Sequence, residues 1–311
     1  MAEGPRYGRL SVPAPEWYTK RMHGADTPHI SIGIPTRDGG VLLKRLLQAV
    51  FAQESRWRYE VYALDSGSTD GTLRLLEKFP VRVVPVAQDT FNWGRLRERL
   101  FEEARAPVVV NLSQDAVPAR TDWLDNLVAP LLDREVQVVC GGSVPDPERA
   151  FPQFAWECNG YYYFTREMQR FAERYGRGLS FANTAVRRSA WEKLHIGEQA
   201  TGEDFGYQTR LHAAGAKIVF TEDAPVLHHH NYTLRGVYRR CRNEGLALRE
   251  MGVPYGLGDC LADLALWKKN VQFLREIRHG RLRNAAEWAY PFLRPLAVYH
   301  GSRFARKMVW Y

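Results

Sequence analysis

An aspartate ends one of the most apolar stretches of this chain. Val108, Val109 and Val110 form a run suited to a buried strand, and Gln114 and Asp115 follow a few residues later. A carboxylate is costly to bury, so its place directly after a core strand indicates a use in binding or catalysis. Two further acidic loops, PTRDGG (35–40) and DSGSTDGT (65–72), follow other apolar runs in the same way.

These acidic loops point to a divalent cation and phosphates. In an open parallel sheet, ligands bind beyond the carboxyl ends of the strands, where loop amides and helix N-termini converge. Mg²⁺ and Mn²⁺ accept carboxylate oxygens and keep positions open for phosphates. No GxGxxG follows the first strand, and GxxxxGK[ST], GxSxG and HExxH do not occur. We therefore expect phosphates to be held through Mg²⁺ or Mn²⁺.

An alternation of short β-branched runs and amphipathic stretches must position these loops. The expected strands are 30–35, 61–66, 81–86, 108–113 and 136–142, with helices in 41–51, 72–79, 96–104 and 123–132. This alternation predicts an α/β protein with a mostly parallel sheet flanked by helices. The acidic loops after the first, second and fourth strands would then face one crevice.

Composition divides the chain into three parts. With 311 residues, 45% hydrophobic and 25% charged, it suits one large domain with an appendage. We expect an N-terminal arm (1–28), an α/β domain (29–232) and a helical extension (233–311). The four cysteines form no CxxC pair, and no apolar run approaches the roughly 18 residues of a membrane span. Because the first residues also lack the apolar centre of a secretory signal, we expect a cytoplasmic protein.

The net charge of +8 comes from the C-terminal end. Residues 268–311 hold ten Lys or Arg side chains against Glu276 and Glu287. This segment is also rich in aromatic residues, so it suits peripheral contact with an anionic membrane at the inner face of the cell membrane. The alternative is a solvated helical face whose aromatic residues pack on the main domain.

Five motifs in order resemble a known family. They are FNWGRLR (91–97), SQDAVP (113–118), FANTAVRRSAW (181–191), GEDFGYQTRLHAAGAKI (202–218) and VLHHHNYTLRGVYRR (226–240). Together with DSGSTDGT, they resemble the family 2 glycosyltransferases with the GT-A fold, in particular the bacterial rhamnosyltransferase-like branch. The resemblance covers roughly residues 29–250. It implies a nucleotide-binding half (29–145) and an acceptor half (146–232).

The resemblance implies that the strand-end loops and FNWGRLR bind a nucleotide-diphosphate sugar. The implied donor-binding residues are Pro35, Thr36, Arg37, Asp38, Asp65, Ser66, Gly67, Asn92, Gly94, Arg97, Gln114 and Asp115. Asp65 would hydrogen bond to the base or ribose. The alternative for its loop is a strand-to-helix turn with Ser68 or Asp70 as the cap. Arg97 is either a diphosphate partner or half of a buried ion pair.

The same resemblance assigns the metal site and the base. Gln114-Asp115-Ala116 offers one acid where the family has two or three, so His228 and His230 are candidates to complete the shell around Asp115. Ordinary surface or core histidines are the alternative. Asp204 corresponds to the family's general base and Glu203 would orient it or the acceptor. Two acids at a helix start are otherwise explained by the helix dipole.

Aromatic residues suggest an acceptor platform, and three positions depart from the branch. Trp156 and Tyr162 could stack on a sugar, although packing in a helical core is the alternative. Asn183 lies in a segment that lines the acceptor side in the family.

Trp93 replaces the usual His, while Arg95 and Glu98 replace a small residue and an Asn. These departures indicate a changed donor pocket.

The sequence as a whole predicts an inverting, metal-dependent glycosyltransferase. It would move a sugar, with rhamnose or another deoxysugar as the leading candidate, to a hydroxyl of a glycan or lipid-linked glycan. The alternatives are a nucleotide-sugar pyrophosphorylase, for which PTRDGG is a poor match, and a non-catalytic nucleotide- or glycan-binding protein. The basic tail also suggests a nucleic-acid binder, but no base-reading motif is present and we expect no nucleic acid. The sequence does not indicate an oligomeric state.

Overall fold

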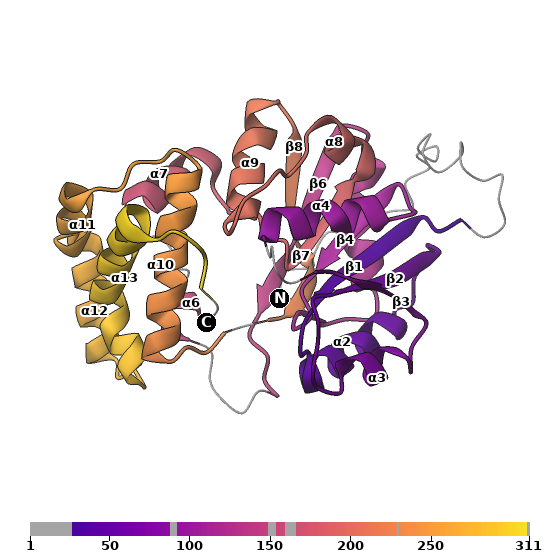
Figure 1. The fold of residues 1–311 in the computed structure, drawn as a ribbon, viewed down its shortest axis with the longest axis horizontal. Coiled ribbons are helices and arrows are strands. Elements are labelled where there is room, and N and C mark those ends of the chain that lie inside the picture. The colour runs from indigo at the N-terminus through magenta and orange to yellow at the C-terminus, as the bar shows by residue number, and fades with distance from the viewer. Residues whose placement is uncertain (1–26, 88–91, 149–153, 159–165, 229, 310–311) are drawn as a thin grey trace, which may run out of the picture.

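The structure is a computed structural model that describes residues 27–87, 92–148, 154–158, 166–228 and 230–309. Most of the predicted N-terminal arm lies outside these residues. A sheet with helices against it forms one side of the molecule, and a group of helices from the C-terminal end of the chain forms the other (Figure 1). Within the described residues, no helix is both long and apolar enough to cross a membrane.

One sheet of eight strands organises the first region. The strands are β1 (Ile30–Thr36), β2 (Tyr59–Asp65), β3 (Val81–Pro85), β4 (Val108–Leu112), β5 (Val117–Pro118), β6 (Val136–Val144), β7 (Asn183–Arg187) and β8 (Lys217–Leu227). Their order is β3-β2-β1-β4-β7-β6-β8-β5. β3, β2, β1 and β4 pair in parallel, as do β6 and β8. β7 is antiparallel to both of its neighbours, β4 and β6, and β5 is antiparallel to β8.

Helices cover both faces of the sheet. They are α2 (Gly40–Phe51), α3 (Thr72–Leu76), α4 (Trp93–Glu103), α5 (Trp123–Val128), α8 (Arg188–Lys193) and α9 (Glu203–Ala213), with a 3₁₀ turn η1 (Ala129–Leu132). Alternate residues of β4 divide between two apolar clusters, because side chains of a strand point to opposite faces. Val108 and Val110 join the cluster of α2 and α5, while Val109 joins that of α4 and α9.

The predicted fold class is confirmed, and the structure adds strands that the sequence did not indicate. The five expected strands are present within about two residues of their predicted bounds. β7 was missed because its first residues, Asn183 and Thr184, are polar although fully buried, so the segment does not show an apolar run. β8 was missed because Glu222 and Asp223 interrupt its alternation.

The C-terminal helices form a second core. They are α10 (Leu234–Glu250), α11 (Leu257–Leu264), α12 (Trp267–Arg278) and α13 (Ala285–Phe304). Two short helices, α6 (Ala155–Cys158) and α7 (Arg166–Tyr175), precede β7 in the chain. Phe154 and Trp156 pack into the core of the C-terminal helices, so this core also recruits a segment from the middle of the chain.

Two glycines let α10 and α13 approach closely. A Cβ atom at Gly245 would lie 2.0 Å from the carbonyl oxygen of Val298, and one at Gly301 would lie 1.9 Å from that of Arg242. Contacts this short are forbidden, so any side chain at either position must push the helices apart.

Gly245→Ala is therefore expected to destabilise the protein by about 1–3 kcal/mol, the usual cost of overpacking. Denaturant unfolding of the full chain measures this change. Gly258→Ala in α11 is the matched control, because nothing lies within 4 Å of its Cβ position and alanine favours a helix. Equal stability of the two variants would contradict the close packing of α10 and α13.

Candidate active site

The loops after β1, β2 and β4 are joined by hydrogen bonds. The Gln114 side chain accepts from the backbone N–H of Arg37 at 3.0 Å and donates to its carbonyl at 2.9 Å. Asp38 adopts a left-handed conformation with φ 45°, which Asp tolerates better than most residues. Its carboxylate accepts from the N–H of Thr69 at 2.8 Å, and its own N–H donates to Ser68 at 2.9 Å. The three strand ends thus meet as predicted from the parallel order.

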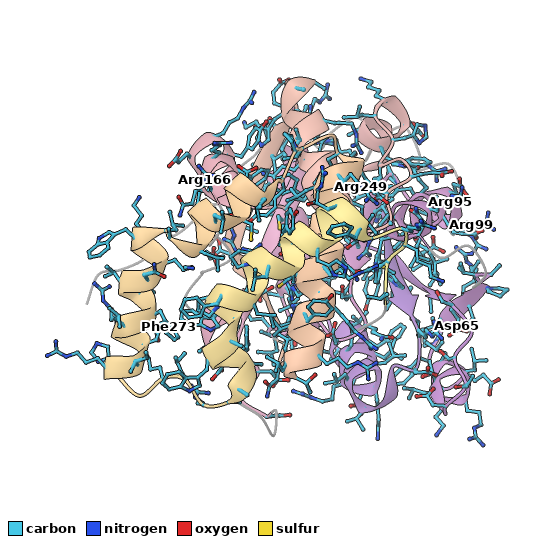
Figure 2. The ribbon with its side chains drawn as sticks, turned by 60° about the vertical axis from the view of Figure 1, so that its left-hand side comes forward. Asp65, Arg95, Arg99, Arg166, Arg249 and Phe273 are labelled. Atoms are coloured by element: carbon cyan, nitrogen blue, oxygen red, sulfur yellow. The ribbon has the colours of Figure 1, made fainter. Side chains whose placement is uncertain are left out.

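Asp65 organises its own loop. One carboxylate oxygen accepts from the backbone N–H groups of Gly67 and Ser68, both at 3.0 Å, and the other accepts from the Ser68 hydroxyl. Asp70 accepts from the N–H of Thr72 at 2.8 Å, at the start of α3. The strand-to-helix turn of the alternative is therefore present, although the N-cap of α3 is Gly71 and Asp70 stands one residue before it. Asp65 lies in the sheet half, across the view from Phe273 of the C-terminal helices (Figure 2).

Asp115, His228 and His230 come together beside the sheet. The antiparallel pairing of Val117 with Leu227 places the residues before β5 next to those after β8. Each of the three side chains offers one ligand atom, and these atoms lie within 4.8 Å of one another. His228 Nε2 is 3.5 Å from Asp115 Oδ1. All three side chains are half-buried, so the cluster is accessible to a ligand.

A buried charge cluster lies at the start of α9. The guanidinium Nε of Arg97 is 3.4 Å from Glu203 Oε1, and both side chains are buried. Burial and the neighbouring Glu203 raise the pKa of Asp204 to about 7, while Arg97 and the N–H of Phe205 act in the opposite direction. The buried ion pair that the sequence offered as one alternative for Arg97 is thus present.

The segment 180–183 connects this cluster to the end of β4. The Arg97 guanidinium lies 5.2 Å from the ring of Phe181 and 5.5 Å from the ring of Trp93. The backbone carbonyl of Ala182, the residue after Phe181, accepts from the N–H of Ser113. Asp204 is therefore held at the same end of the sheet as the strand-end loops. Arg97 Nη1 is buried and has no hydrogen-bond partner among the described residues.

Asn92 and Gly94 fasten α4 to the segment before α9. The Asn92 side chain accepts from the N–H groups of Arg95 and Gln199, each at 3.0 Å. The N–H of Gly94 donates to the Gln199 carbonyl, and a Cβ at Gly94 would lie 2.1 Å from the carbonyl oxygen of Gly197. Both residues thus have structural uses within the protein.

Glu98 is one of the three positions that depart from the rhamnosyltransferase-like branch. Its side chain makes structural contacts that the sequence did not predict. It accepts from the Trp191 indole at 2.8 Å and from the N–H of Gly197 at 2.6 Å. Arg95 pairs with Glu198 at 2.8 Å. Both side chains therefore face the 191–198 segment. The sequence around Glu98 does not indicate these contacts, because Trp191 and Gly197 lie about a hundred residues away in the chain.

Two of the residues predicted for the acceptor are core residues. Trp156 is 1% exposed, its indole N–H donates to the Glu287 carbonyl at 2.6 Å, and its ring stacks on Phe273 and Tyr290. A ring buried in this way has no face open to a sugar, so its predicted acceptor role is wrong and the packing alternative holds. Tyr162 lies outside the described residues.

Asn183 is also used entirely within the fold. It accepts from the Trp123 indole at 3.1 Å and donates to the carbonyls of Gly142 and Ala224. These bonds hold β6, β8 and α5 together around a fully buried amide, which leaves no group for an acceptor. The prediction that Asn183 contacts the acceptor is therefore wrong as well.

The loops after β1 and β2 place their predicted residues at different depths. Pro35, Thr36 and Ser66 are buried in the strand ends, where the Thr36 hydroxyl donates to the Ile34 carbonyl. Gly67 has φ 79° and Arg37 is partly exposed. Arg37, Asp38 and Gly67 are thus the more accessible members of the predicted donor set.

Solved structures identify the fold. A mannosyltransferase from Pyrobaculum calidifontis in complex with GDP-Man and Mn²⁺ aligns with a TM-score of 0.62 over 91% of this chain and 89% of its own, at 16% identity. Glucosyl-3-phosphoglycerate synthase from Mycobacterium tuberculosis, with Mn²⁺, UDP-glucose and phosphoglyceric acid, aligns at 0.57 over 80% and 87%, at 18% identity. The sheet, its helices and the strand-end loops thus have the GT-A fold.

The chain belongs to glycosyl transferase family 2, whose sequence model matches residues 31–194. The O-antigen chain rhamnosyltransferase RfbN of Salmonella typhimurium is 28% identical over 276 residues, 83% of each protein. The O-antigen chain rhamnosyltransferase WbaN of Salmonella anatum is 26% identical over 277 residues, 84% of each. The predicted family and enzyme class are confirmed, and the pyrophosphorylase and non-catalytic alternatives fall away.

Proposed function

We propose that this enzyme is a metal-dependent, inverting glycosyltransferase that moves a deoxysugar such as rhamnose from a nucleotide-diphosphate donor. The acceptor is a hydroxyl of a glycan or lipid-linked glycan in the synthesis of a cell-envelope polysaccharide. The observation that carries the proposal is the convergence of Asp115, His228 and His230 from segments more than a hundred residues apart. The two O-antigen rhamnosyltransferase relatives support the sugar and the pathway class.

The donor set of this cluster fits a divalent cation with open positions. One carboxylate oxygen and two imidazole nitrogens supply three ligands, which leaves room for diphosphate oxygens. Imidazole ligands suit Mn²⁺ better than Mg²⁺, which prefers oxygen. A cation bound there would stabilise the charge that develops on the leaving diphosphate.

The strand-end loops supply the donor contacts in this proposal. Arg37 and Asp38 present backbone and side-chain groups beside Gln114, next to the aspartate of the metal cluster. Asp65 is mostly occupied by its own loop, so it acts by shaping that loop against the nucleoside. The loops are held by hydrogen bonds before a donor arrives, which lowers the entropic cost of binding.

Asp204 is the general base of the proposed reaction. It takes the proton of the acceptor hydroxyl while that oxygen attacks the anomeric carbon, on the side opposite the departing diphosphate. A base with a pKa near 7 is unprotonated often enough to act and basic enough to accept the proton. Arg97 and Glu203 hold the first turn of α9 in place.

A thermal-shift panel of nucleoside diphosphates, each with and without Mn²⁺, tests the donor and metal together. We expect one nucleotide to raise the melting temperature clearly only when Mn²⁺ is present, because the cation joins the diphosphate to the protein. Equal stabilisation without metal would contradict the metal-bridged donor. Release of nucleoside diphosphate from the matching deoxysugar donor then tests transfer.

A lipid-linked acceptor would be held at a membrane. Peripheral contact of residues 268–311 with an anionic membrane belongs to the same proposal, since this segment carries the net charge of the chain.

A further inference from the structure

Helix α12 buries three polar side chains and exposes large apolar ones. Its buried residues are Lys269, Gln272 and Glu276. Trp267 and Leu274, by contrast, are 78% and 64% exposed. A surface helix normally buries its apolar stripe and shows its polar residues to water. The outward stripe of α12 is therefore suited to an apolar environment outside the described protein.

The buried polar face of α12 is well satisfied. Lys269 donates to the carbonyls of Leu264 at 2.9 Å and Pro291 at 3.1 Å. Glu276 accepts from Arg281 at 2.6 and 2.8 Å and from Gln272. Because buried polar groups are costly unless paired, this network fixes the orientation of the helix. The exposed apolar stripe is a consequence of that orientation.

Helix α13 continues the apolar surface. Trp288, Phe292 and Leu296 are spaced by four residues and are 46%, 41% and 50% exposed. Phe273 of α12 contacts the rings of both Trp288 and Phe292, at 6.0 and 5.1 Å. The apolar patch is defined as Trp267, Leu274, Ile277, Trp288, Phe292 and Leu296. Single exposed apolar residues are common, but six on two helices whose rings meet at Phe273 are a candidate interaction site.

The exposed charged side chains of segment 267–304 are all positive. Its exposed cations are Lys268, Arg275, Arg278, Arg281 and Arg283. The acidic residues of segment 267–304, which the structure describes without a gap, are Glu276 and Glu287, and both are buried. Within segment 267–304 every exposed charged side chain is therefore a cation, which attracts an anionic partner.

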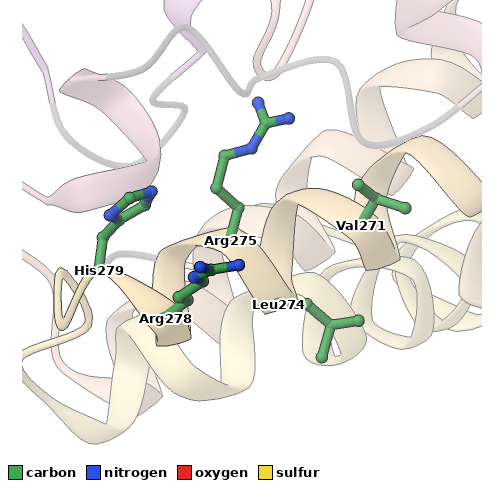
Figure 3. Close-up of a pocket in the computed structure, with 5 residues that line it drawn as sticks. All are labelled: Val271, Leu274, Arg275, Arg278 and His279. Atoms are coloured by element: carbon green, nitrogen blue, oxygen red, sulfur yellow. The ribbon is translucent and has the colours of Figure 1, made fainter.

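Part of this cationic rim forms an open concavity. Arg275, Arg278 and His279 stand around it together with Val271 and Leu274, all on or directly after the last turns of α12 (Figure 3). Cations beside aliphatic side chains suit a bilayer surface, which offers both phosphates and acyl chains.

We propose that the apolar patch of α12 and α13 inserts into the surface of an anionic phospholipid bilayer, with Arg275, Arg278 and His279 against lipid phosphates. The aliphatic members, Leu274, Ile277 and Leu296, cannot stack on bases, which favours lipid over nucleic acid. Tryptophans at the edge of an apolar surface prefer the membrane interface. The inference rests on the proposed function only for its setting, a lipid-linked acceptor held at a membrane.

Vesicle flotation of the purified full chain tests the inference without donor, metal or acceptor. We expect binding to vesicles of phosphatidylglycerol and phosphatidylcholine, weak binding to pure phosphatidylcholine, and loss of binding as salt is raised. Because no sugar is transferred in this assay, its outcome is independent of the enzymatic proposal. An inactive Asp204→Asn variant is expected to bind vesicles as the unaltered chain does.

Two double variants separate the contributions of charge and insertion. Arg275→Gln/Arg278→Gln is expected to weaken binding about thirtyfold, since each cation near an anionic surface contributes roughly a factor of five. Trp267→Ser/Leu274→Ser is expected to weaken it by about tenfold or more. The controls are Arg99→Gln/Arg105→Gln and Val41→Ser/Leu73→Ser, which remove two exposed arginines and two exposed apolar side chains from the sheet half.

Lipids with brominated acyl chains provide a direct readout of insertion. Their quenching of tryptophan fluorescence should fall in Trp267→Phe, while vesicle binding is kept because the apolar surface remains. Three results would overturn the inference: equal affinity for neutral and anionic vesicles, equal losses in the control variants, or a dimer in solution that the Trp267→Ser/Leu274→Ser change abolishes. The last result would assign the patch to a second copy of this chain.

Discussion

Asp204→Asn is expected to lower the rate of sugar transfer by about a hundredfold to ten-thousandfold, the usual contribution of a general base. The amide cannot take the acceptor proton, but it keeps the size of the side chain at the start of α9. Donor affinity should therefore stay within about twofold, since the base contacts the acceptor and not the nucleotide. Steady-state transfer and nucleotide titration of the same preparation measure the two effects.

The pH profile provides an independent check of this assignment. Because the base acts unprotonated and its pKa is raised to about 7, kcat/KM should rise with pH through about 7 and then level off. Asp133→Asn is the control: this carboxylate is exposed and pairs with Lys217 at the surface, so its loss should change little. Near-normal turnover of Asp204→Asn would end the assignment of the base.

Asp115→Ala is expected to weaken Mn²⁺ binding in the presence of nucleoside diphosphate by about a hundredfold or more. The change removes the carboxylate of the cluster and leaves two imidazoles, and the loss of supporting groups alone commonly costs tenfold to a hundredfold. Electron paramagnetic resonance of free and bound Mn²⁺ measures the affinity directly, without any turnover. Donor binding should fall in parallel because the metal joins the diphosphate to the protein.

A histidine control sharpens the metal experiment. His228→Gln and His230→Gln should each weaken Mn²⁺ binding, whereas His195→Gln should not, since His195 is exposed and contacts Glu98 instead. Unchanged Mn²⁺ affinity in Asp115→Ala would show that the metal, if it is used, binds elsewhere. Equal effects of the three histidine changes would indicate nonspecific loss of affinity.

Periodicity was sufficient to predict β1, β2, β3 and β4, which pair in parallel. The strands through 144 are continuous apolar or β-branched runs, because strands covered on both faces need no polar side. The strands after residue 180 could not be found in this way. Asn183 and Thr184 are polar but buried through hydrogen bonds to backbone groups, and such partners are set by tertiary structure alone.

The same limit applies to the candidate site. Residue type and order predicted which carboxylates and histidines to examine, and Asp115, His228 and His230 are indeed neighbours. Type alone could not separate an amide that binds a ligand from one that holds the fold together, as Asn92 and Asn183 do. Nor could it separate an exposed tryptophan such as Trp267 from the buried Trp156.

The position of β7 has a consequence for synthesis of the protein on the ribosome. Strands β4 and β6 emerge first, yet β4 must keep one edge open until residues 183–187 arrive. Strand β6 must keep both edges open, because its other partner, β8, comes later still. A nascent chain of about 180 residues thus has bare edges on both β4 and β6, and such edges are templates for wrong pairing and aggregation. The sheet cannot be completed before β7 is synthesised. We therefore expect the protein to fold slowly and to depend on chaperones.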